Sequence, residues 1–119
     1  MSGEPFARPF VEPHIRFRVH VPEAEERITP SVEDTLQADV SLSTRERGIE
    51  TSGGIITNYL DGDESVFDIE DSLASVREIN IIQEEIINSV NQYTGTTVAG
   101  SDITVEAALI RVFTSRRLR

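Results

Sequence analysis

The clearest pattern along the chain is an alternation of apolar and polar residues over 15–21. The apolar residues fall at every second position, as Ile15, Phe17, Val19 and Val21. A period of two is that of a strand with one buried face, so we predict a strand here. The same period predicts a second strand over 36–42. Two more are expected on either side of Gly53 and Gly54, because paired glycines supply the positive φ angles of a tight hairpin turn.

Apolar residues three and four positions apart over 68–93 predict one long helix. A turn over 61–64 precedes it, early acidic residues suit its N-terminus, and Gly95 ends it. Ile81 and Ile87 lie beside the main apolar stripe. They indicate a second contact, either with a partner subunit, which we favour, or with the edge of a wide core.

Segment 103–113 is rich in β-branched residues and favours a strand, although the spacing of its apolar residues also permits a helix. As a strand it is expected to pair with 96–98 through a turn over 99–102. Together these elements predict an α+β fold: a small, mostly antiparallel sheet or barrel-like body with one long helix in the C-terminal half.

Residues 1–13 are predicted to form an extended arm, because Pro5, Pro9 and Pro13 exclude a helix. Phe6 and Phe10 on such an arm are costly to expose, at roughly 1.5–3 kcal/mol each. We therefore expect them to dock, either on their own domain or on a neighbouring subunit. A single domain is expected over 14–115.

The last four residues form an Arg-rich tail, with Arg116, Arg117 and Arg119. The tail is suited to contact an acidic neighbour or nucleic acid, and it is equally typical of a solvated chain end. Met1–Pro5 lacks the basic start of a signal peptide, and no run of apolar residues is long enough to span a membrane. We expect neither secretion by a signal peptide nor membrane insertion.

The net charge of the chain says more about its function than any sequence motif does. The chain has 21 acidic and 11 basic residues, for a net charge of −10, and every basic residue is Arg. An acidic, Lys-free surface suits a protein from a halophile, because concentrated salt screens the repulsion between acidic groups. The same charge opposes general binding of nucleic acid, with the Arg tail as the one exception.

Candidate chemistry is sparse. The two histidines, His14 and His20, are six residues apart and are expected on opposite faces of the first strand, so they do not form a metal site alone. The chain has no cysteine, no Gly-rich phosphate loop and no zinc-protease helix motif. The acidic cluster over 61–71 is expected to be a solvated turn and a helix start. We predict no catalytic residues, no metal and no cofactor.

The arm, the strand-rich body, the helix over 68–93 and the Arg cluster over 116–119 together resemble the build of small virion proteins of tailed viruses, of the head-to-tail connector, tail-completion or capsid-accessory type. The resemblance implies a structural subunit that contacts copies of itself and other proteins in a virion, or in the cytoplasm before assembly. With the acidic composition it suggests a virus of halophilic archaea. Two other classes stay open: an oligomeric ligand-binding or scaffold module of a halophilic cell, and a small enzyme using a histidine with Asp39 or Glu50.

Overall fold

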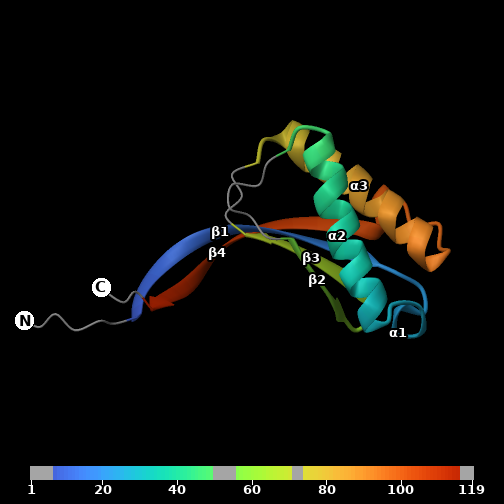
Figure 1. Ribbon diagram of the computed structural model, residues 1–119, viewed down its shortest axis with the longest axis horizontal. Coiled ribbons are helices and arrows are strands. Elements are labelled where there is room, and N and C mark those ends of the chain that lie inside the picture. The colour runs from blue at the N-terminus through green and yellow to red at the C-terminus, as the bar shows by residue number, and fades with distance from the viewer. Residues whose placement is uncertain (1–6, 50–55, 71–73, 116–119) are drawn as a thin grey trace, which may run out of the picture.

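The computed structural model of the chain describes residues 7–49, 56–70 and 74–115. In chain order its elements are β1 (Ala7–His20), α1 (Ala24–Arg27), α2 (Pro30–Glu46), β2 (Ile56–Asp61), β3 (Glu64–Glu70), α3 (Val76–Thr94), the 3-10 turn η1 (Gly100–Asp102) and β4 (Ile103–Ser115). The strands form one antiparallel sheet in the order β2-β3-β1-β4. Helices α2 and α3 cover one face of this sheet (Figure 1). The predicted α+β class is confirmed.

The hydrophobic core lies between the sheet and these two helices. Ile15, Phe17 and Val19 of β1 are buried, as their alternation predicts, and Phe17 lies opposite the equally buried Phe67 of β3. Val21 is also buried, just beyond the end of β1. The strand predicted over 15–21 is therefore confirmed, and it extends farther toward the N-terminus than the alternation alone indicates.

The strand predicted over 36–42 is wrong, because this segment lies within helix α2. Its buried residues are four apart, Leu36, Val40 and Thr44, whereas Leu42 is 49% exposed. The helix has a regular N-terminus, in which the hydroxyl of Thr29 accepts the N–H of Val32 at 3.4 Å and Pro30 occupies the first turn. These start signals and the four-residue spacing outweigh the short alternation.

The predicted turn at 61–64 is confirmed, and it joins β2 to β3 with Gly62 at φ 67°. The predicted helix start at 68 is wrong, since 68–70 still belongs to β3. Helix α3 begins later, at a capping box in which Ser75 and Glu78 bond each other's backbone N–H groups. It ends where predicted, at Gly95 with φ 72°. The predicted glycine hairpin at 53–54 lies outside the described residues.

Segment 103–113 is a strand, as predicted, but its predicted partner is wrong. β4 pairs with β1 along its whole length, from Val19 opposite Ile103 to Ala7 opposite Ser115. Residue 98 is held to helix α3 instead, because the Asn91 amide bonds both the N–H and the carbonyl of Val98, at 2.8 and 3.0 Å. That side-chain tether takes the place of the hairpin expected at 99–102.

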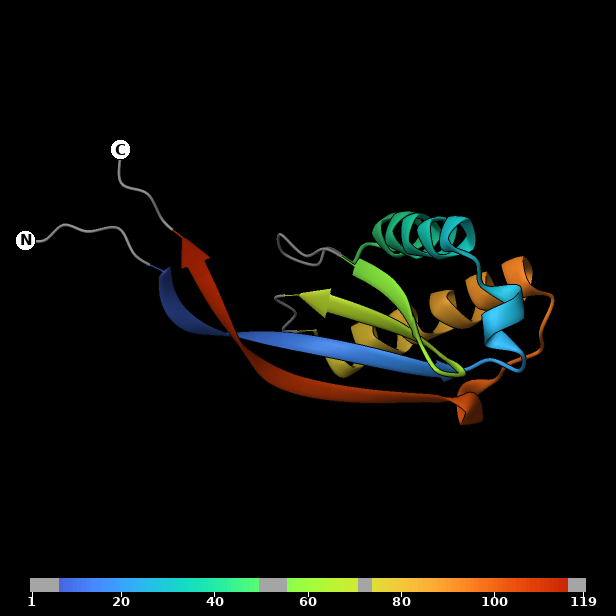
Figure 2. The same ribbon diagram turned by 90° about the horizontal axis from the view of Figure 1, so that it is seen from below.

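The predicted arm is extended from Ala7 onward, but that part of it is the first half of β1. Residues 7–13 pair with 109–115 in register, and no other described strand adjoins them. This two-stranded stretch, called the ribbon below, runs past the helices and twists away from the rest of the protein, residues 14–108, called the body (Figure 2). The ribbon helps to give the molecule its extents of 58 × 30 × 21 Å.

Candidate interaction surface

The sheet face opposite the helices carries an ordered set of ion pairs. Arg16 donates two hydrogen bonds to the same oxygen of Asp68, at 2.8 and 3.3 Å. The other Asp68 oxygen lies 2.8 Å from Nδ1 of His14. The hydrogen bond to Asp68 raises the pKa of Arg16 above its ordinary value. Asp68 of β3 thus bonds two side chains of the adjacent strand β1, those of His14 and Arg16.

Arg18 links all four strands across this face. From β1, its Nη1 reaches Asp61 of β2 at 3.0 Å and Glu64 of β3 at 3.3 Å, and its Nε reaches Glu106 of β4 at 3.0 Å. Hydrogen bonds to Glu106 and Asp61 raise the pKa of Arg18 above its ordinary value. Because these guanidinium groups already bond carboxylates, the face does not present a free basic patch to a nucleic acid.

His14 and His20 lie on the same face of β1, so the expectation of opposite faces is wrong; an even separation along a strand always returns to the same side. They nevertheless do not converge. His14 is bonded to Asp68, and His20 lies 3.1 Å from Asp63 at the far end of the strand. Within the described ranges, no group of three or more His, Cys, Asp or Glu side chains is arranged to hold a metal ion.

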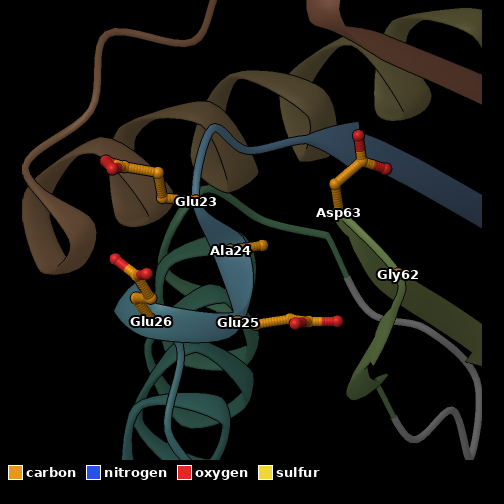
Figure 3. Close-up of a pocket in the computed structure, with 6 residues that line it drawn as sticks. All are labelled: Glu23, Ala24, Glu25, Glu26, Gly62 and Asp63. Atoms are coloured by element: carbon orange, nitrogen blue, oxygen red, sulfur yellow. The ribbon is translucent and has the colours of Figure 1, made fainter.

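A shallow hollow of about 280 Å³ lies where α1 meets the turn between β2 and β3 (Figure 3). Its lining is Glu23, Ala24, Glu25, Glu26, Gly62 and Asp63. All of these except Ala24 are exposed to solvent. Ligand sites combine apolar walls with a few convergent polar groups, and this hollow offers neither an aromatic wall nor a cationic group. Of the acidic cluster predicted over 61–71 as a solvated turn and a helix start, Asp61 and Asp63 are exposed at the turn, whereas Asp68 lies in β3 and is bonded to His14 and Arg16.

The two edges of the sheet differ sharply. At the β2 edge, helix α2 supplies side-chain acceptors to two outward backbone N–H groups. Gln37 accepts the N–H of Asn58 at 2.9 Å, and Glu33 accepts the N–H of Leu60 at 3.1 Å. A strand whose N–H groups are already bonded is a poor template for another chain. The β2 edge is therefore closed.

The opposite edge, formed by β4 and called the β4 edge, is open along the described chain. β4 is 13 residues long and pairs with β1 on one side. Residues 104–107 are exposed on both of its faces, and Val105 remains 38% exposed although it lies on the helix side of the sheet. The strand has no Pro, Gly or Lys, the residues with which proteins usually blunt an edge. Its backbone is available for pairing.

The residues predicted to make contacts are spread over the molecule. Ile81 is 8% exposed and belongs to the core, and Ile87 packs against that core. Helix α2, which the sequence pattern did not predict, packs on α3 and gives that helix a second contact within the same chain. Phe10 lies in the ribbon, opposite Val112. Phe6, Arg116, Arg117 and Arg119 lie outside the described residues.

The β4 edge was missed because strand order cannot be read from a single strand's pattern; the absence of blunting residues in 103–115 was the available signal. Among the described residues, no helix has the length and apolar character needed to cross a lipid bilayer.

Comparison with known protein families finds no match, and comparison with curated proteins finds none either. Among solved structures, a de novo designed protein, Foldit4, is similar at 16% sequence identity over 92% of this chain and 100% of its own, with a TM-score of 0.34. A likeness at that level supports no argument about function.

Proposed function

We propose that this chain is a non-catalytic structural subunit of a larger protein assembly, of the kind found in the head, neck or tail of a tailed virus. The ribbon is the observation that carries the proposal. Its two strands, 7–13 and 109–115, pair only with each other among the described residues. A two-stranded ribbon is marginally stable in water, because it has no sheet neighbour and no layer beneath it.

The composition of the ribbon strengthens this reasoning. Its strands read ARPFVEP and LIRVFTS, and the register places Pro9 opposite Phe113 and Phe10 opposite Val112. Apolar side chains stabilise a protein more when a further surface covers them and removes them from water. Another subunit can supply that cover, in the way that terminal arms join subunits in virion assemblies.

The sheet face supports a structural role over a catalytic one. Arg16, Arg18 and His14 are bonded to carboxylates, so these groups serve the sheet itself. A general acid or base must be free to reach a substrate, whereas these side chains bond carboxylates of neighbouring strands. We further propose that the assembly works in concentrated salt, because the acidic, Lys-free surface suits that solvent.

The proposal is tested by the mass of the protein in solution, measured by light scattering in low and then high potassium chloride, with circular dichroism to show that the chain is folded. We expect a defined oligomer that persists or grows in high salt, because apolar contacts are not screened. A folded monomer at every protein concentration and every salt concentration would contradict the proposal.

A further inference from the structure

We propose that the β4 edge pairs with the β4 edge of a second copy of this chain, antiparallel and about a twofold axis, to form one sheet of eight strands, four from each copy. This inference rests on the proposed function and names the first interface of the assembly. It concerns the outward backbone groups of β4. The contact proposed above instead covers the apolar side chains of the ribbon.

The difference between the two edges limits the pairing to two copies. Glu33 and Gln37 accept two outward N–H groups of β2, those of Leu60 and Asn58, so that edge is a poor acceptor of a further strand. The β4 edge has no such cover in the described part of the chain. A twofold contact uses the same edge of both copies and leaves only the closed β2 edges outside. The pairing therefore ends at a dimer and does not grow into a fibre.

Charge favours a second copy at this edge over association elsewhere. The chain carries a net charge of −10, so two copies repel over most of their surfaces. β4 has one acidic residue, Glu106, and one basic residue, Arg111, and is neutral overall. Glu106 is moreover already bonded to Arg18 of its own chain. The neutral strand is where two like-charged copies approach at the lowest electrostatic cost.

The sequence of β4 also fits a twofold axis near its middle. When the axis passes through a residue of β4, each residue lies opposite one on the same face of the sheet. The numbers of the two residues are then both even or both odd. An axis through Ala107 places Glu106 opposite Ala108, and an axis through Ala108 places it opposite Ile110. Small side chains then meet at the axis, and no two like charges lie directly opposite, an arrangement that stabilises cross-strand pairing.

A charge-swap experiment tests this geometry. Ala107→Lys and Ala107→Glu each place like charges near the axis, and we expect the dimer dissociation constant to rise about tenfold in either variant. An equimolar mixture of the two variants should restore wild-type affinity or exceed it. Leu42→Lys and Leu42→Glu introduce the same charges at an exposed position of α2, which contacts β2 at the opposite edge of the sheet, and should leave association unchanged. Sedimentation equilibrium measures the constants, and circular dichroism shows that each variant is folded.

Cysteine cross-linking tests the same contact without introducing charge. The natural chain has no cysteine, so Ala107→Cys or Ala108→Cys introduces a single thiol. Across a twofold axis through that residue, the two thiols meet at disulfide distance. We expect one of the two variants to form a covalent dimer under mild oxidation, which also identifies the axis, and Leu42→Cys to form none.

The possible failures can be told apart. If the wild-type protein is oligomeric but neither the charge variants nor the cysteine variants respond, the β4 pairing is wrong and the proposed assembly function stands on another surface. The twofold geometry is equally overturned if the charge variants dissociate but their mixture does not reassociate. If the wild-type protein is a folded monomer up to about millimolar concentration, well above the dissociation constant of a stable interface, both proposals fail.

Discussion

Deleting residues 1–13 is expected to leave the body folded while lowering the mass of the assembly. The deletion removes one strand of the ribbon and leaves β1 from His14 onward. All register pairs between β1 and β3 remain, since they begin at His14 opposite Glu70. The β1–β4 pairs from His14 opposite Ala108 to Val19 opposite Ile103 also remain. The perturbation is therefore confined to the ribbon, in which 109–115 lose the strand that they pair with.

The magnitude follows from where the core lies. Among the residues whose side chains the structure describes, which begin at Glu12, the first member of the hydrophobic core is Ile15, so the deletion removes no residue of that core. Because a lone two-stranded ribbon is only marginally stable, its loss should change the free energy of unfolding by about 1 kcal/mol or less. For a domain of this size that corresponds to a shift in Tm of roughly 4 °C. Truncation of a single core side chain in Phe17→Ala, which is 0% exposed in the wild type, should instead cost about 3–5 kcal/mol.

Thermal and urea unfolding of the wild type, the deletion variant and Phe17→Ala, monitored by circular dichroism, measure these differences, and light scattering gives the mass of each. We expect the deletion variant to retain the wild-type transition and to form nothing larger than the dimer joined at the β4 edges. The reasoning is refuted if the deletion destabilises the chain as much as Phe17→Ala does. The segment would then belong to the core of its own domain, and the ribbon would not be an assembly element.

Three further substitutions test individual features of the fold by urea unfolding. Asp68→Ala removes the acceptor of Arg16 and should lower the free energy of unfolding by about 1–2 kcal/mol; an unchanged midpoint would mean that the ion pair adds nothing. Gly95→Ala should cost about 1 kcal/mol, because an L-residue is strained at φ 72°, although a Cβ there would have room. Gln37→Met leaves the N–H of Asn58 without its acceptor; we expect a loss of about 1 kcal/mol and, from the reopened β2 edge, visible aggregation on concentration.

Helix α2 shows why the sequence pattern was insufficient. Leu36 and Val40 are four residues apart, a spacing that satisfies both a period of two and a helical stripe. Ala38 and Leu42 complete the alternation and favoured the strand. In the structure both of them are exposed. Thr44, four residues after Val40, is buried and continues the helical stripe. A short segment with both periods is decided by what it packs on, and that information lies outside the segment.

The first strand was predictable for the opposite reason. Ile15, Phe17 and Val19 satisfy only the period of two, and the charged residues between them lie on the open face. What could not be predicted was its neighbour, β4, which comes some 90 residues later in the chain. Strand order depends on how α2 and α3 pack on one face, so the open edge of the sheet follows from tertiary structure and not from β4 itself.

The same charges that hold the sheet together also direct where copies of the chain can meet. Several of the described arginines bond carboxylates of their own chain, namely Arg16, Arg18, Arg27 and Arg47. Arg18 does so in two directions through Nε and Nη1, a geometry that the single ammonium group of lysine does not offer. The remaining acidic groups repel those of another copy, over a screening length of about 10 Å at 0.1 M salt and about 3 Å at 1 M. Concentrated salt thus removes the main cost of association, while backbone pairing at a neutral strand such as β4 is left intact.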